Sequence, residues 1–423
     1  MFKQLGHIFK GDKVIWMVFL FLSLISIVEV FSASSELTYK GGSYWAPVMK
    51  HGGVLFVGLI GIIITCHIPC KYFRILTGFF LIVSFLSLLA VLIVGQSTNG
   101  AQRWISFLGV QFQPSEIAKG SMVLATAQIL SAMQTDKGAD DHAFKYICVV
   151  GLALIGLIFF ENLSTAVLLA VVVFMMMDIG RVSWKYLRVV AGGAITVVVL
   201  ALSAVMLIGQ DESQLPNPQT QLTETLQPQE DKGIVDKVFH RASTWKTRII
   251  KQVEGFKGSP SDVDLDRDAQ RAHANIAIAS SNVIGKGPGN SVERDFLSQA
   301  FSDFIYAIII EEMGIVGAIF VALLYIILLF RTRYIANRCE NSFPAFLAMG
   351  LALLLATQAV MNMWVAVGLA PVTGQPLPLV SKGGTSTIIN CIYIGAILSV
   401  SRTAKKRDKV AADSASASPA PSA

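Results

Sequence analysis

Long apolar runs recur along the 423-residue chain and are separated by short polar segments. Apolar runs of about 18 or more residues with few charges are typical of helices that span a membrane. The pattern predicts ten such helices, at 14–34, 52–66, 73–95, 114–133, 144–160, 163–178, 187–208, 303–330, 342–368 and 383–401. The fold class expected is all-α: a polytopic membrane protein with ten transmembrane helices and a large extracytoplasmic loop at about 209–302.

Lysine and arginine are divided unevenly between the two sides of this predicted bundle. Both termini and the loops on their side carry eighteen of these residues, whereas the short segments on the opposite side carry four. Cytoplasmic loops of membrane proteins are enriched in Lys and Arg, so we expect both termini to be cytoplasmic and the long loop to be external. Because the positive charges are sorted by side, the net charge of +6 is not a nucleic-acid signature.

The organisation along the chain is simple. Residues 1–401 are expected to form one membrane domain, followed by a disordered cytoplasmic tail at 402–423. Within the external loop, 211–233 is rich in Gln and Pro and is expected to be disordered. Residues 234–257 place apolar side chains at helical spacing, which predicts an amphipathic helix either at the membrane surface or packed on the bundle.

Five polar clusters gather near the extracytoplasmic ends of the predicted helices. They lie at 99–104, 113–119, 161–165, 285–303 and 371–384. The loops on the cytoplasmic side carry mainly scattered basic residues. We therefore expect a functional site that several loops assemble at the outer face.

The second cluster places a carboxylate and a cation on one helix face. Pro114 suits the first helical position, and Glu116 in the first turn complements the helix dipole. Lys119 is about 4.5 Å deeper and about 60° round the helix. It either pairs with Glu116, or lies in a cleft that binds an anionic headgroup, and Arg103 beside Trp104 permits the same two interpretations; we favour binding for both.

A glycine-rich run beginning at Gly285 leads into an apolar helix that carries three carboxylates. Asp303 is expected to start this helix, where it either caps the N-terminus or acts as a general base beside apolar surface. Glu311 would lie about 12 Å deeper, and Glu312 would point about 180° away from Asp303. One of the glutamates is expected to hold helices together through hydrogen bonds.

These residues resemble the SEDS family (shape, elongation, division and sporulation), and specifically its FtsW branch. The motifs that carry the resemblance are Ser32–Ser34, Asn99–Trp104, Gln113–Lys119, Gly289–Val292, Ser302–Gly314 and Pro371–Ser386. They run from the first predicted helix to the last. The GNSV run at 289–292 looks more like FtsW than like the elongation branch, RodA.

The resemblance implies an enzyme, a peptidoglycan glycosyltransferase that polymerises lipid II into glycan strands at the bacterial plasma membrane during cell division. It implies a catalytic Asp303 and substrate-binding residues Arg103, Glu116, Lys119 and Ser381. Supporting residues are expected at Gln113, Ser115, Asn99, Gln270, Asn290, Ser291, Gly383 and Gly384. The implied partners are lipid II, an undecaprenyl-diphosphate-linked glycan, a class B penicillin-binding protein, other division proteins and membrane lipid. A divalent cation, magnesium or manganese, could assist; no organic cofactor and no nucleic acid are expected.

The chain departs from the family pattern at two motifs. Where the family usually has PDLGT, this chain has ENLST at 161–165, and where the family often has PEAHTDF it has SQAFSDF at 298–304. Other functions stay open from the residues. The chain could be a lipid II flippase, an elongation polymerase like RodA, or a scaffold that recruits division proteins.

Overall fold

The computed structural model describes residues 9–33, 45–94, 96–98, 101–107, 110–193, 196, 203, 269–297 and 300–416. The predicted features at 211–233 and 234–257 lie outside these ranges, as does Asn99. The described helices of ten or more residues are α2 (Lys13–Ala33), α4 (Ala46–His67), α5 (Cys70–Val94), α6 (Pro114–Ala132), α7 (Asp141–Glu161), α8 (Leu163–Ile179), α12 (Ala269–Ser280), α13 (Ile305–Ala336), α14 (Ser342–Ala366) and α15 (Thr385–Ser416).

Most predicted spans match observed helices to within a few residues. Within the described part of the chain, seven helices are long and apolar enough to cross a membrane, and the 17-residue α8 is a shorter apolar helix. Helix α4 begins six residues before the predicted 52–66. Its first turn contains Pro47, which suits that position, followed by polar Lys50 and His51 that resembled a loop. Of the predicted span 187–208, residues 187–193 are helical and most of the rest is not described.

Helix α6 is less apolar because it lies inside the bundle. It packs against α5, α7, α8 and α14, so most of its surface meets protein. Charged and hydroxyl side chains on such a helix can find hydrogen-bond partners instead of facing lipid. Burial differs sharply between helices: 72% of the apolar segment of α14 is buried inside the protein, against 22% of that of α5. Polar chemistry is therefore concentrated on α6 and α14.

Helices α4 and α15 approach closely through glycines. A Cβ added at Gly58 would lie 2.6 Å from Cys391 Sγ, and one at Gly395 would lie 2.9 Å from the carbonyl oxygen of Ile62. Small residues let the backbones of membrane helices pack directly on each other. This contact fixes α15, and with it the loop that precedes α15, against α4.

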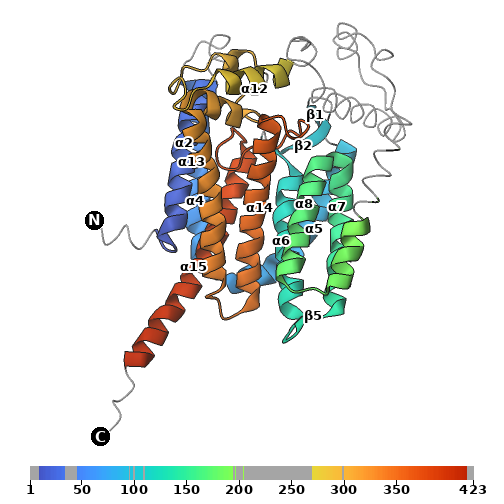
Figure 1. The fold of residues 1–423 in the computed structure, drawn as a ribbon. Coiled ribbons are helices and arrows are strands. Elements are labelled where there is room, and N and C mark those ends of the chain that lie inside the picture. The colour runs from blue at the N-terminus through green and yellow to red at the C-terminus, as the bar shows by residue number, and fades with distance from the viewer. Residues whose placement is uncertain are drawn as a thin grey trace.

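The all-α expectation is wrong in one respect, because two small antiparallel sheets are present. Strands β1 (Gln96–Thr98), β2 (Ala101–Phe107) and β3 (Val110–Phe112) form one sheet, and β4 (Gln134–Thr135) and β5 (Gly138–Ala139) form another. Strand β2 packs against α5, α6 and α7. In Figure 1 β1, β2 and α12 lie at one end of the bundle, here called the α12 end, and β5 lies at the other.

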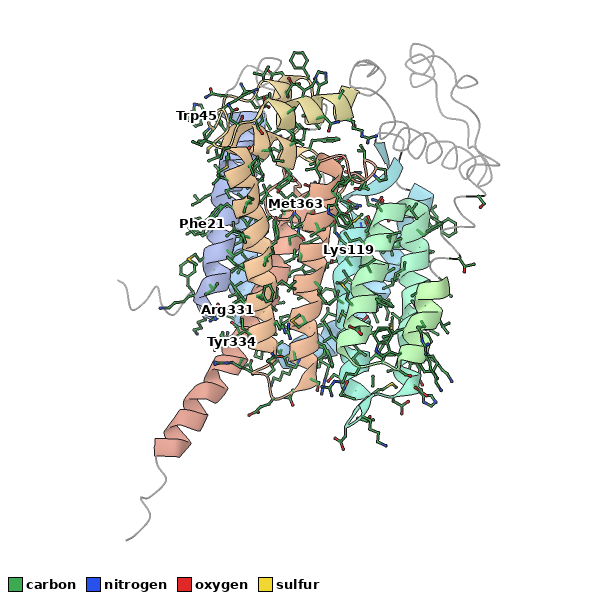
Figure 2. The ribbon with its side chains drawn as sticks, viewed as in Figure 1. Phe21, Trp45, Lys119, Arg331, Tyr334 and Met363 are labelled. Carbon is green, nitrogen blue, oxygen red and sulfur yellow. The ribbon has the colours of Figure 1, made fainter. Side chains whose placement is uncertain are left out.

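The beginning of α2 and the middle of α15 meet at the β5 end. The backbone N–H of Asp12 donates to Ser401 Oγ at 2.9 Å, and the guanidinium of Arg331 binds the Asp12 carboxylate. Arg331 lies toward that end in Figure 2. Helix α15 then continues to Ser416, into the tail predicted at 402–423. Ala, Lys and Arg in 402–412 favour helix, which explains the extension.

Helix α13 is two helices joined at Gly314, which has φ 69° and ψ −172°. The hydroxyl of Tyr306 donates to the carbonyl oxygen of Ala318 at 3.2 Å. In a straight helix these residues would be about 18 Å apart along the axis, beyond the reach of a tyrosine. The chain therefore bends back at Gly314. The predicted span 303–330 is corrected to a short helix over 305–313 followed by a long helix over 315–336.

Gly314 makes this bend together with Gly285. A Cβ at Gly314 would lie 2.3 Å from the carbonyl oxygen of Val283, and one at Gly285 would lie 2.4 Å from the nitrogen of Gly314. Both have positive φ, which L side chains rarely adopt. The backbone N–H groups of Lys286 and Gly287 donate to the carbonyl oxygens of Glu311 and Glu312 at 2.9 and 2.8 Å, which caps the short helix.

Candidate functional site

Asp303 lies in a turn before the short helix of α13, not at its capping position. The helix begins at Ile305, and Phe304 occupies the N-cap without a side-chain cap, so the predicted capping role is wrong. The carbonyl oxygen of Asp303 accepts from Asn362 Nδ2 of α14 at 3.0 Å. Its carboxylate accepts from Ser302 Oγ at 3.2 Å, and the residue is half-buried. Asp303 is thus held on the bundle while its carboxylate does not cap the helix.

The 371–384 loop holds the same turn from the other side. Ser381 Oγ donates to the carbonyl oxygen of Ser302 at 2.6 Å, and the N–H of Leu377 donates to Ser381 Oγ at 2.8 Å. Ser381, predicted to bind substrate, is 2% exposed. It therefore holds the backbone next to Asp303.

Glu116 and Lys119 form a buried ion pair inside the bundle. Lys119 Nζ donates to Glu116 Oε1 and to Gln358 Oε1 of α14, both at 2.8 Å. Lys119 is 0% exposed and Glu116 is 2% exposed. Figure 2 shows Lys119 surrounded by helices. Of the two alternatives for Lys119, its contacts are those of the ion pair; binding of an anionic headgroup stays a prediction.

Helix α14 connects this ion pair to Asp303. Gln358, the partner of Lys119, and Asn362, the partner of Asp303, are four residues apart and therefore share one helix face. Both also donate to the 371–384 loop, at the carbonyl oxygens of Pro376 (3.0 Å) and Gln375 (2.8 Å). Asp303, Glu116, Lys119 and Ser381 thus belong to one hydrogen-bonded assembly. Neither Gln358 nor Asn362 was predicted as a site residue. Two amides four residues apart in an apolar helix were the sequence signal that could have indicated them.

The junction of α7 and α8 joins the assembly through the ENLST segment. Ser115 Oγ donates to Glu161 Oε1 at 3.3 Å, and Gln113 Nε2 donates to Ser115 Oγ at 2.8 Å. Asn162 caps α8 by accepting from the backbone N–H groups of Ser164 and Thr165. Thr165 Oγ1 in turn accepts from Gln375 Nε2 at 2.6 Å. A carboxylate and an amide are therefore built into this junction despite the departure from the family motif.

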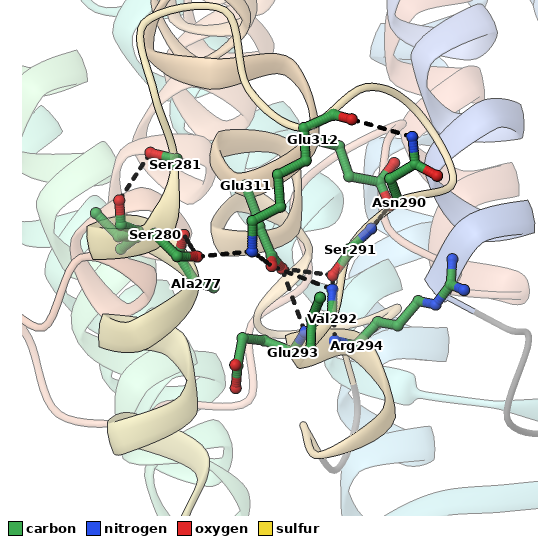
Figure 3. Close-up of polar contacts among 12 residues, drawn as sticks. Ala277, Ser280, Ser281, Asn290, Ser291, Val292, Glu293, Arg294, Glu311 and Glu312 are labelled. Atoms are coloured by element: carbon green, nitrogen blue, oxygen red, sulfur yellow. Dashed lines mark hydrogen bonds and ion pairs between the residues drawn. The ribbon is translucent and has the colours of Figure 1, made fainter.

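Glu311 and Glu312 organise a second cluster around the loop at 286–294 (Figure 3). Glu311 accepts from Lys286 Nζ at 2.6 Å, from Ser291 Oγ at 2.5 Å and from the N–H of Val292 at 3.1 Å. Glu312 accepts from the N–H of Gly289 at 2.9 Å and from the hydroxyl of Ser32 on α2.

Both glutamates are 0% exposed and both hold structure together, where one was expected to do so. The partners of Glu311 come from the loop that follows α12, so Glu311 lies at the α12 end rather than deeper along a straight helix. Asn290 and Ser291 belong to this cluster. Asn290 Nδ2 donates to the carbonyl oxygen of Lys286 at 3.0 Å.

The remaining predicted residues are placed in part. Of Arg103 the structure describes the backbone, on β2, so its substrate contact stays a prediction. Gln270 is half-buried on α12, which packs on α13. Gly383 and Gly384 form the turn that opens α15, and Gly384 has φ 52°. Among the described residues, no group of three or more His, Cys, Asp or Glu side chains is arranged to hold a metal ion.

The molecule is thus a polytopic helical protein whose buried polar assembly joins α6, α14 and two loops at one end. The family model described as "Cell cycle protein", which covers FtsW, RodA and SpoVE, matches residues 12–233 and 234–406. The chain belongs to this family.

Individual relatives agree with this assignment. The chain is 28% identical over 400 residues to the probable peptidoglycan glycosyltransferase FtsW of Coxiella burnetii, covering 91% of this chain and 95% of that protein. It is 28% identical over 413 residues to the protein of the same name from Halomonas elongata, covering 94% and 93%.

Two solved structures share the fold. A chain of a peptidoglycan synthase complex, described as showing structural coordination of polymerization and crosslinking, has a TM-score of 0.67 at 23% identity, covering 93% of this chain and 98% of that chain. The rod shape determining protein RodA of Thermus thermophilus has a TM-score of 0.59 at 22% identity, covering 93% and 97%.

Proposed function

We propose that this protein is a peptidoglycan glycosyltransferase that polymerises lipid II during cell division. The observation that carries the proposal is the attachment of the Asp303 turn, by Asn362 and Ser381, to the assembly that contains Glu116 and Lys119. Family membership and the names of the relatives support the reaction class and favour division over an elongation role like that of RodA.

In the proposed reaction, Asp303 removes the proton from the 4-hydroxyl of an acceptor sugar. That oxygen attacks the anomeric carbon of a lipid-linked glycan, with inversion, and undecaprenyl diphosphate leaves. A half-buried carboxylate on a turn suits a general base, because it can reach substrate while its position is held. The leaving diphosphate needs positive charge near it.

The buried ion pair has a supporting part in this mechanism. Lys119 is fully buried and its ammonium already contacts Glu116 and Gln358. Breaking a buried pair is costly, so in the proposal Lys119 maintains the geometry of α6 and α14. The neutralising charge is assigned to Arg103 and to other cations. The residues described near Asp303 provide no metal-ligand set, so no step is assigned to magnesium or manganese.

The membrane placement is also part of the proposal. Ten spans, an external loop at about 209–302, cytoplasmic termini and an extracytoplasmic active site agree with the distribution of Lys and Arg. The meeting of Asp12 with Ser401 agrees with termini on one side. The proposed partner is a class B penicillin-binding protein, which would crosslink the strands, together with other division proteins.

The test is lipid II polymerisation by the purified protein with its partner. Asp303→Asn should lose at least about 100-fold in rate, the usual contribution of a general base. Asp136→Asn, which makes the same change at an exposed position near β4, should be unaffected. Polymerisation by Asp303→Asn at the wild-type rate contradicts the mechanism. Translocation of labelled lipid II in proteoliposomes without polymer formation would instead indicate a flippase. Normal growth of cells that carry Asp303→Asn would indicate a scaffold.

A further inference from the structure

Lys382 lies beside the turn that carries Asp303. Its backbone N–H donates to the carbonyl oxygen of Phe301 at 2.9 Å, and its ammonium is 4.7 Å from the centroid of the Phe301 ring. Phe301 is two residues before Asp303. The ammonium is therefore held on the segment that positions the proposed base.

A second cation acts on Lys382. Burial and the positive charge of Lys50, on the second turn of α4, both lower the pKa of the Lys382 ammonium. Geometry places the start of α4 beside this loop, because His51, the residue after Lys50, contacts Ser26 Oγ at 2.7 Å, and Ser26 Oγ donates to the carbonyl oxygen of Val380, two residues before Lys382. Like charges on the two elements repel each other, and partial burial weakens the screening by water. An anion bound at Lys382 would reduce this cost.

The start of α15 adds hydrogen-bond donors next to Lys382. The first N–H groups of a helix have no intrahelical partner and carry the positive end of the helix dipole. In α15 the N–H of Ser386 donates to the carbonyl oxygen of Gly383 at 3.0 Å, so the other N–H groups of this turn are the donors for a ligand. Ser386 in this first turn is 4% exposed, and among the described residues its hydroxyl has no hydrogen-bond partner. Ser386 Oγ lies 3.7 Å from where a Cβ of residue 383 would be, so it is adjacent to the Gly383–Gly384 turn. An unpaired buried hydroxyl at such a place points to an unfilled contact.

The loop that carries Lys382 is held firmly. Ser26 Oγ of α2 donates to the carbonyl oxygen of Val380 at 2.6 Å and contacts His51 Nε2 of α4 at 2.7 Å. Because the single hydroxyl proton goes to Val380, the imidazole must donate from Nε2. Together with the Ser381 contact to Ser302, these bonds fix the loop on both sides of Lys382. A site fixed in this way binds without a large ordering cost.

We infer that Lys382, Lys50 and the first turn of α15 form a binding site for the diphosphate group of a polyprenyl diphosphate. Helix N-termini bind phosphate through backbone N–H groups, and lysine binds it as a point charge. The inference rests on the proposed function and deepens it, because it assigns the charge that receives the leaving group. Lys119 is unsuited to that part, since it is enclosed with Glu116 and Gln358.

The test measures binding of tritiated farnesyl diphosphate to the full-length protein in phosphatidylcholine nanodiscs. Lys382→Met should weaken binding about tenfold or more, the value of one charge-assisted hydrogen bond. Lys50→Gln should weaken it less, and Lys382→Arg should stay within about threefold of wild type because the charge remains. Lys71→Gln, which removes an exposed lysine elsewhere on the bundle, is the matched control.

Competition identifies the chemistry that is bound. Inorganic diphosphate should compete and farnesol should not, and nanodiscs containing phosphatidylglycerol should leave the affinity unchanged. Wild-type affinity in Lys382→Met overturns the inference, as does equal competition by farnesol. Loss of binding in phosphatidylglycerol nanodiscs would show a general site for anionic lipid, which also overturns it.

The two proposals fail separately. Asp303→Asn should bind farnesyl diphosphate like wild type while polymerisation is lost. If the wild-type protein binds the diphosphate but never polymerises lipid II, the proposed function fails and the site stands. If the wild-type protein polymerises while Lys382→Met keeps full affinity, the site fails and the function stands.

Discussion

Replacing Lys119 by methionine should destabilise the protein strongly, because it removes one partner of a buried ion pair. Methionine has nearly the same length and volume, so the change removes charge more than packing. Glu116 Oε1 would lose its 2.8 Å contact, and Oε2 already has no partner among the described residues. Gln358 Oε1 would lose its donor as well.

The magnitude follows from what is left behind. Breaking a buried pair by removing one charge costs about 3–5 kcal/mol. A single charge at the centre of a membrane helix costs about 2.5–3.5 kcal/mol on insertion scales, which agrees. Lys119→Met should therefore lower the free energy of unfolding by about 3–5 kcal/mol. Adding Glu116→Gln removes the stranded charge, so the double variant should recover about 1–3 kcal/mol.

Equilibrium unfolding in mixed micelles of dodecyl maltoside and SDS, followed by circular dichroism, measures these differences. Lys137→Met, an exposed lysine in the turn between β4 and β5, is the control and should change stability by less than about 0.5 kcal/mol. A Lys119→Met protein within about 1 kcal/mol of wild type would refute the buried pair. So would a double variant no more stable than the single one.

Three further outcomes are expected. Gly314→Ala should cost at least about 1–2 kcal/mol from its positive φ alone, with more from the contact with Val283, whereas Gly78→Ala on α5, with open space around it, should be neutral; melting temperatures compare them. Glu311→Gln should speed amide hydrogen exchange over 286–293, because each hydrogen bond to the charged carboxylate is worth about 1.5–3 kcal/mol. Unchanged protection of these amides would argue against the Glu311 cluster. Because the pKa of Lys382 is lowered, its ammonium loses its proton at a pH below the ordinary lysine value of about 10.4. Farnesyl diphosphate binding should therefore weaken before the pH reaches that value, and Lys382→Arg should abolish this decline. The same shift means that the protonated lysine destabilises the fold below its folded-state pKa; this cost falls as pH rises above that pKa and is gone above the ordinary lysine value.

The spans show how much of the fold was predictable. Helices α2, α5, α6, α8 and α14 match their predicted ranges to within a few residues. In a membrane an apolar run of this length has to satisfy its backbone internally, and the helix is the local way to do so. Asp303, Glu116 and Lys119 could also be named, because ionisable residues stand out in an apolar chain. The amides Gln358 and Asn362, which join them, were missed.

The hydrogen-bond partners of those residues were not predictable from the sequence. Lys119 is 239 positions from Gln358, and Ser32 is 280 positions from Glu312. The apolar residues on both sides of Gly314 looked like one straight helix, because a bend there depends on the approach of Gly285 and on backbone donors from Lys286 and Gly287. Local pattern therefore determined where the helices run and which residues carry chemistry. Only the packed structure decided which of those charges neutralise each other. A charged side chain is neutralised by the group it contacts within about 3 Å, and that group comes from elsewhere in the chain.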